Sequence, residues 1–190
     1  FSAAEWVPFG PVDSTKDRDS YGPGLDLYRK MVSTEYLGDT FRLMMIKAAE
    51  NKLLSFGCSR DILSMTYLDL ETLLDFLQAP TTGGTLAHFC REPEDRAVGL
   101  AMAHAVLDRA VRLVCANLSA VLQFTGAGRD AASPACLGIW GSALDSSALR
   151  TRLETYLHTF TQNVLGLHVS LCQGESMLTV GSAMAALYNC

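Results

Sequence analysis

Residues 97–124 read AVGLAMAHAVLDRAVRLVCANLSAVLQF, and this stretch decides the fold that the sequence predicts. Its only charged side chains are Asp108, Arg109 and Arg112, so a helix formed from it is apolar on nearly every side. Upstream, a Glu-Pro-Glu-Asp run suits a helix start, and a glycine after the stretch suits its end. The charges interrupt it too often for a membrane span. The sequence therefore predicts a central apolar helix over about residues 92–125, surrounded by other helices.

Apolar residues recur at helical spacing on both sides of this stretch. Phe41, Met45 and Ala48 predict an amphipathic helix from Thr40 to Phe56, after a break and N-cap at Gly38-Asp39. Further helices are expected over residues 62–77, from Asp145 or Ser146 through Leu171, and from Ser176 onward. No window alternates as a strand would. We therefore expect an all-α fold, an irregular globular helix bundle, with a single helical domain over residues 25–190.

Residues 1–24 have no helical period and contain several prolines and glycines, which favours an extended arm. Trp6, Phe9 and Tyr21 lie in this arm, and such aromatic side chains are costly to leave in water. We expect the arm to dock through them on its own domain or on a partner subunit. The alternative is a frayed terminus.

The composition describes a folded globular chain of 190 residues, with 49% hydrophobic residues, 18% charged residues and a net charge of −5. The lysines and arginines are scattered, which argues against direct nucleic-acid binding by this segment. Pairs such as Arg29-Lys30 are interpreted as solvated helix faces. The chain begins at Phe1 without a signal peptide or membrane span, which indicates a processed product or part of a longer protein. The six cysteines lie far apart, and we expect an intracellular, reducing environment.

The motifs of hydrolases, metalloproteases and nucleotide-binding loops are absent, and we expect no catalysis. One spacing is compatible with a metal. On a helix, His168 and Cys172 would share a face, and Cys90 could supply a third zinc ligand. A closed structural site needs a fourth ligand, which is missing nearby, because Met177 is a poor one. The expectation is either no cofactor or a structural zinc ion; the alternative is a core histidine and a buried thiol.

The run HVSLCQGESM at residues 168–177 resembles the zinc-site segment of herpesviral post-transcriptional regulators and mRNA export factors. Cys90, His168 and Cys172 match three of that family's four ligand positions, and Met177 stands at the last. The run LRTRLETY at residues 149–156 also looks like the helix before the family's motif. The resemblance implies a helical C-terminal homology domain that forms a homodimer through an N-terminal arm, located in the nucleus or cytoplasm.

The function expected from these features is that of a non-enzymatic dimerising domain of a viral regulator of mRNA processing and export. Two other readings fit the residues alone. One is a helix-bundle adaptor or assembly subunit unrelated to RNA, and the other is a carrier of an apolar ligand. All three imply protein partners or a buried ligand, without contact to a membrane.

Overall fold

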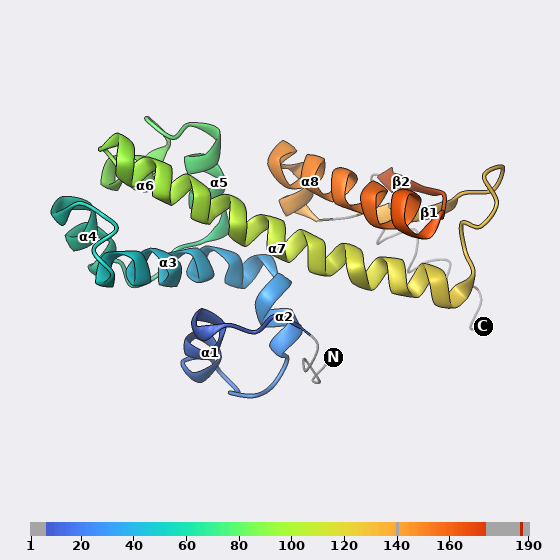
Figure 1. Cartoon of the computed structure of the whole chain (residues 1–190), viewed down its shortest axis with the longest axis horizontal. Helices are drawn as coiled ribbons and strands as arrows, with labels where there is room; N and C mark the ends of the chain where they lie inside the picture. Colours follow the sequence, from blue (N-terminus) through green and yellow to red (C-terminus); the bar gives the residue numbers. More distant parts are fainter. Residues whose placement is uncertain (1–6, 140, 174–186, 188–190) are drawn as a thin grey trace. The chain divides into compact units, whose positions relative to one another are not determined.

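The computed structural model describes residues 7–139, 141–173 and 187 of the chain (Figure 1). The chain divides into two compact units, Phe1–Leu113 and Val114–Cys190, where we expected a single domain over residues 25–190. The boundary between the units lies inside helix α7 (Pro93–Thr125). The predicted central helix over about residues 92–125 is therefore confirmed in its position and length.

The described part of the first unit is built from helices. They are α1 (Pro11–Arg18), α2 (Leu27–Val32), α3 (Thr34–Glu50), α4 (Phe56–Leu63), α5 (Leu70–Gln78), α6 (Gly84–Phe89) and the first part of α7. Helix α3 packs against α4 and α5, with Phe41 and Met45 fully buried and Ala48 nearly so. The predicted apolar face of this helix is confirmed.

The predicted break at Gly38-Asp39 is wrong, because α3 begins at Thr34 and continues through both residues. A Cβ atom on Gly38 would lie 2.3 Å from the carbonyl oxygen of Leu68. The glycine therefore permits a close approach between α3 and the segment before α5, which is a packing role.

Helix α1 lies inside the segment that we expected to be extended. Pro11 occupies its first position, where the missing N–H costs nothing. The Asp13 carboxylate accepts a hydrogen bond from the Gly10 N–H at 2.9 Å and so satisfies a free donor at the helix start. Of the aromatic residues expected to dock the arm, Phe9 is 38% exposed, Tyr21 is fully exposed, and Trp6 lies outside the described residues.

The second unit contains the remainder of α7, strand β1 (Ala135–Ile139), a 3-10 turn η1 (Ser142–Asp145), α8 (Ser147–His158), a π-helical turn η2 (Thr159–Val164) and strand β2 (Val169–Gln173). The two strands pair in parallel, from Ala135 opposite Val169 to Ile139 opposite Gln173. The all-α prediction is therefore wrong.

The long helix expected through Leu171 ends early for a local reason. Its last turn widens into η2, and Gly166 then adopts a φ of 65°, which a helix cannot continue through. The chain leaves this turn in an extended conformation and forms β2. The helix expected from Ser176 lies outside the described residues.

We had expected helix α7 to be buried on all sides, but the structure buries only one of its faces. The residues on that face recur every three or four positions and include Ala103, Leu107, Ala110, Cys115 and Leu122. Small residues such as Ala101, Ala105 and Ala116 lie on its exposed face. In the described part of the chain, no helix is both long enough and apolar enough to cross a membrane.

Candidate functional site

The first unit contains a polar pocket of about 300 Å³ between α1 and α3, which we call the α1–α3 pocket. Its lining combines carboxylates, two cationic side chains, hydroxyl groups and two tyrosines. These residues are Lys16, Asp19, Ser20, Glu35, Tyr36, Asp39, Arg42, Leu43 and Tyr67. They come from separate segments of the sequence, so no local motif indicates the pocket.

Lys16 is the most deeply buried charged group of the pocket, at 5% exposure. Its ammonium group donates hydrogen bonds to the Lys30 carbonyl oxygen and, at 2.6 Å, to the Thr40 hydroxyl. It also lies 5.7 Å from the centre of the Tyr36 ring, within reach of a cation–π interaction. Burial lowers the pKa of Lys16 to about 8, and the nearby Asp13 carboxylate opposes this shift.

Two ion pairs, each with one deeply buried partner, hold the N-terminal segment against the rest of the first unit. Asp13 is 1% exposed and accepts a hydrogen bond from Arg109 of α7 at 2.7 Å. Lys30 is 4% exposed and pairs with Asp17 at 2.5 Å, which lowers the pKa of the Asp17 carboxyl. The interpretation of Arg29-Lys30 as a solvated face is therefore wrong for Lys30, because the loop before α2 encloses its ammonium group.

The rim of the pocket is set by ion pairs on α3. Arg42 binds Asp39 at 2.5 Å and donates to the Met65 carbonyl oxygen at 3.2 Å, while Glu35 binds Arg29 at 3.1 Å. The Asp39, Arg42 and Glu35 side chains at the rim of the α1–α3 pocket are therefore engaged in ion pairs within the first unit.

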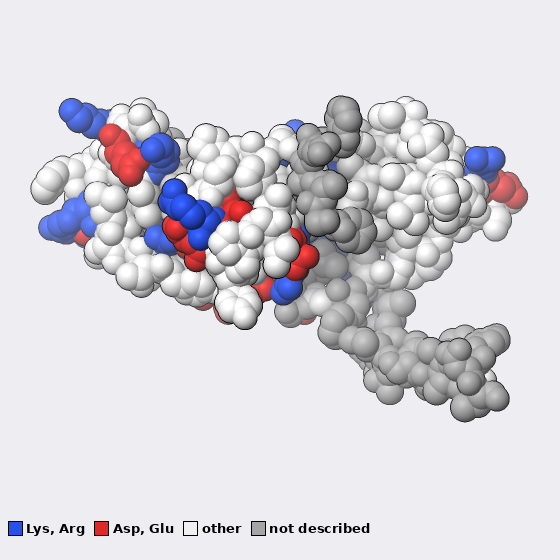
Figure 2. Space-filling model, turned by 90° about the horizontal axis from the view of Figure 1, so that it is seen from below, with Lys and Arg blue, Asp and Glu red and all other residues white. Residues whose placement is uncertain are grey.

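A second hollow, of about 350 Å³, runs along α8 in the second unit. Its lining is formed by Ser147, Ala148, Thr151, Arg152, Thr155 and Tyr156, all on one helix. On the face shown in Figure 2, side chains of both charge signs lie next to one another among uncharged residues. The residues that the structure describes on that face therefore form no broad basic patch of the kind that binds nucleic-acid phosphates.

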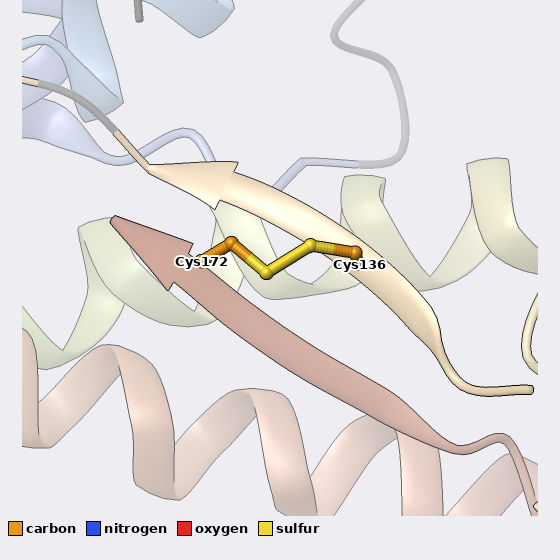
Figure 3. The surroundings of a disulfide bond; sticks show 2 residues. All are labelled: Cys136 and Cys172. Carbon is orange, nitrogen blue, oxygen red and sulfur yellow. A yellow bond between two sulfur atoms is a disulfide. The ribbon is translucent and has the colours of Figure 1, made fainter. Parts of the chain in front are cut away.

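The structure does not bring the three expected zinc ligands together. Cys172 forms a disulfide bond with Cys136 across the two strands (Figure 3), so it has no thiolate to offer a metal. His168 precedes β2 and is not on a helix, and its backbone N–H donates to the Gly128 carbonyl oxygen at 2.7 Å. Cys90 lies in the first unit beside Cys58. Among the described residues, no group of three or more histidine, cysteine, aspartate or glutamate side chains could hold a metal ion.

The sequence of this chain is similar to hexokinases. The model of the hexokinase family matches residues 2–188. Hexokinase-3 from Homo sapiens is 31% identical over 138 residues, which cover 63% of this chain and 15% of the human protein. Hexokinase-3 from Mus musculus is 30% identical over 113 residues, or 54% of this chain and 10% of the mouse protein.

Solved hexokinase structures share the fold of this chain. A hexokinase from Schistosoma mansoni complexed with glucose has a TM-score of 0.67 and 21% identity, and covers 87% of this chain and 38% of its own. A second hexokinase crystal structure has a TM-score of 0.69 and 16% identity, and covers 90% of this chain and 38% of its own. At these identities the likeness concerns the fold, which combines helices with parallel strands.

These findings overturn the viral resemblance. A family match over residues 2–188 is incompatible with a domain of herpesviral mRNA export factors, and the described part of the segment that carried the resemblance contains strand β2 (Val169–Gln173). The expectations of a non-enzymatic viral regulator, of an unrelated adaptor and of an apolar-ligand carrier are therefore wrong. The expectation that the chain is not part of an enzyme is wrong as well, because hexokinases are enzymes.

The chain spans about 15% of the length of the human relative that it matches. An intracellular location agrees with the hexokinase relatives, whereas the nuclear assignment followed from the viral resemblance and has no support. The match of the family model to residues 2–188 decides the family. This chain belongs to the hexokinase family.

Proposed function

We propose that the protein containing this chain transfers a phosphoryl group from a nucleoside triphosphate to a hexose. The observation that carries this proposal is the match of the hexokinase model to residues 2–188. The shared fold with a hexokinase complexed with glucose supports it.

Phosphoryl transfer is catalysed mainly by positioning and by electrostatic stabilisation of the phosphate oxygens. Magnesium in such reactions usually enters with the nucleotide, bound by substrate phosphates and one or two carboxylates. The reaction is proposed for the whole protein, because the chain spans only 15% of the human relative. No residue of the α1–α3 pocket is assigned a catalytic role.

The test is made on the full-length protein that contains this chain. ADP formation from magnesium ATP is followed with and without a hexose, and the mass of the sugar product is measured by mass spectrometry. The control is the same preparation with magnesium removed by a chelator.

The expected result is ADP formation that depends on both the hexose and magnesium, with one hexose phosphate formed for each ADP. ADP formation at the same rate without the sugar would identify an ATPase and overturn the proposal. A well-folded full-length protein that forms no sugar phosphate from any hexose would overturn it as well.

A further inference from the structure

Two reduced cysteines face one another in the core of the first unit. The sulfur atoms of Cys58 and Cys90 lie 3.8 Å apart, and the side chains are 2% and 0% exposed. Cys58 is in the first turn of α4, and Cys90 is the C-cap residue that follows α6. The pair therefore joins two helices that are separated by 32 positions in the sequence.

The start of α4 and the first turns of α7 surround the pair. The Cys58 N–H donates to the Ser55 hydroxyl at 3.2 Å, and that hydroxyl donates to the Asp95 carboxylate at 2.6 Å. In α7, a Cβ atom on Gly99 would lie 3.5 Å from the Cys90 sulfur. The α4 start and α7 thus contribute to the burial of the two thiols.

The contact makes the two thiols chemically unequal. The hydrogen bond from Cys58 lowers the pKa of Cys90, because it stabilises the Cys90 thiolate. The same hydrogen bond, together with burial and the Asp95 and Asp61 carboxylates, raises the pKa of Cys58. Cys90 therefore loses its proton before Cys58 does, and the Cys58 thiol stabilises the Cys90 thiolate by a hydrogen bond.

We propose that Cys58 and Cys90 are an oxidisable dithiol, which a peroxide converts into a disulfide bond between α4 and α6. Their sulfur–sulfur contact is the geometric basis, since a disulfide forms only between sulfurs that can reach each other with little backbone movement. This modification is independent of the proposed sugar kinase activity.

The reaction proceeds in two balanced steps. The Cys90 thiolate attacks one oxygen of hydrogen peroxide, the O–O bond breaks, and the departing hydroxide takes up the proton that Cys90 released, giving water and a sulfenic acid. The Cys58 sulfur then attacks the sulfenic sulfur, the S–O bond breaks, and the departing hydroxide takes the Cys58 proton to form a second water. Two thiols are oxidised and one peroxide molecule is reduced.

Peroxide reaches the buried pair through local opening. The pair sits at the ends of short elements, since α4 has eight residues and α6 has six. Short helices depend on tertiary packing and open at lower free energy than a long core helix. The pair is thus more accessible over time than its static burial indicates.

Cys115 is the natural control within the same chain. It is fully buried in α7, is a free thiol, and has its sulfur 3.9 Å from the Leu153 carbonyl oxygen and not beside another cysteine. Burial raises its pKa to about 11. It therefore has neither an activated thiolate nor a neighbouring thiol to resolve a sulfenic acid.

The experiment treats the whole chain with hydrogen peroxide, alkylates the remaining thiols under denaturing conditions, and maps the peptides by mass spectrometry. The expected product is a linked peptide pair containing Cys58 and Cys90, about 2 Da lighter than the two free peptides together. We expect it to form at least about tenfold faster than Cys115 loses its ability to be alkylated. Melting of the oxidised chain should occur at a higher temperature, because the new bond restricts the unfolded state.

A second measurement uses the Cys58→Ser variant. Without its resolving partner, Cys90 should stop at the sulfenic acid and react with a dimedone-type reagent. The proposal is overturned if the wild-type chain, under peroxide, keeps Cys58 and Cys90 alkylatable for as long as Cys115. It is also overturned if Cys90 links to a different cysteine.

Discussion

The two units of this chain bury different kinds of groups. The first unit encloses charged side chains in its interior, with Asp13, Lys16, Lys30 and Asp95 each at most 5% exposed. In the described part of the second unit, the buried polar side chains are the neutral residues Ser119 and Thr161. The first unit thus holds its buried charged groups by ion pairs and by hydrogen bonds to neutral groups, whereas the buried side chains in the described part of the second unit are uncharged.

The units also differ in the range of the interactions that define them. The helices of the first unit follow from apolar residues three and four positions apart, which are local signals. The strand pair of the second unit joins residues about 34 positions apart, as in the pairing of Leu137 with Leu171. A unit built on local signals can be predicted from one sequence, whereas a parallel pair cannot.

The largest expected effect is in the core of the first unit. Leu107→Asp places an unpaired carboxylate at a fully buried position of α7 and should cost on the order of 4 kcal/mol or more. Against a total stability of roughly 5–15 kcal/mol, this substitution should remove a large part of the stability of the unit. The measurement is urea unfolding followed by circular dichroism.

The matched control is Ala105→Asp, two residues away on the exposed face of the same helix. It should cost less than about 1 kcal/mol, mainly through helix propensity. Equal stability of the two variants would show that α7 buries a different face.

The next largest expected effect is the pH dependence of the stability that the buried Lys16 ammonium group causes. Lys16 has a folded-state pKa of about 8 against an ordinary value of 10.5, so the unfolded chain binds more protons between these two pH values. The destabilising effect of the charged group is complete below pH 8 and is relieved as the pH rises toward 10.5. Stability attributable to Lys16 should therefore rise across this window, by at most about 3 kcal/mol.

The measurement is the unfolding free energy of the wild type and of Lys16→Met at several pH values. The difference between them should move in favour of the wild type from pH 8 to 10.5. Lys47→Met, at an exposed position of α3, is the control and should change stability by less than about 0.5 kcal/mol. If the difference in unfolding free energy between Lys16→Met and the wild type stayed constant with pH, it would contradict the lowered pKa of Lys16.

A smaller loss of stability is expected from a substitution at Gly128, in the segment before β1 of the second unit. A Cβ atom on Gly128 would lie 2.5 Å from the His168 carbonyl oxygen, and Gly128 has a φ of 76°. Gly126 has a similar φ of 73°, but its nearest neighbour is the flexible Arg129 side chain at 3.6 Å. Both alanine variants carry the backbone strain, and Gly128→Ala should cost about 1–3 kcal/mol more. Thermal melting of both variants measures this difference, and equal Tm values would mean that the two segments do not touch.

The smallest expected effect is the loss of stability when the N-cap residue of one helix in each unit is replaced by alanine. Asp69 caps α5 by accepting a hydrogen bond from the Thr72 N–H at 2.8 Å, whereas Ser146 at the start of α8 makes no such side-chain bond. Asp69→Ala should cost about 1 kcal/mol and Ser146→Ala a few tenths. The hydrogen bond lowers the pKa of Asp69, so its contribution is present above the ordinary value of 3.8 and is lost as the pH falls. Urea unfolding at pH 7 and pH 3 measures both changes, and an Asp69→Ala cost that is the same at the two pH values would contradict the capping role.

The sequence allowed the apolar face of α3 and the position of α7 to be predicted, because Phe41, Met45 and Leu107 show the spacing of a buried helical face. It did not reveal α1, which lies in the segment expected to be an extended arm. It did not reveal the burial of Lys30, since a lysine next to an arginine looks like a solvated surface. It also placed Cys172 on a helix, because the π-helical turn and the strand after Gly166 have no local pattern. The α1–α3 pocket was missed for the same reason, as its lining is assembled from distant segments.

The β1–β2 pair distinguishes the fold of this chain from an all-α bundle, and backbone NMR of the chain measures that pair directly. Extended chemical shifts for residues 169–173, slow amide exchange, and nuclear Overhauser contacts between Leu137 and Leu171 are the result expected from the parallel register. Helical shifts continuing from α8 through Leu171, without contacts to residues 135–139, would contradict the α/β fold.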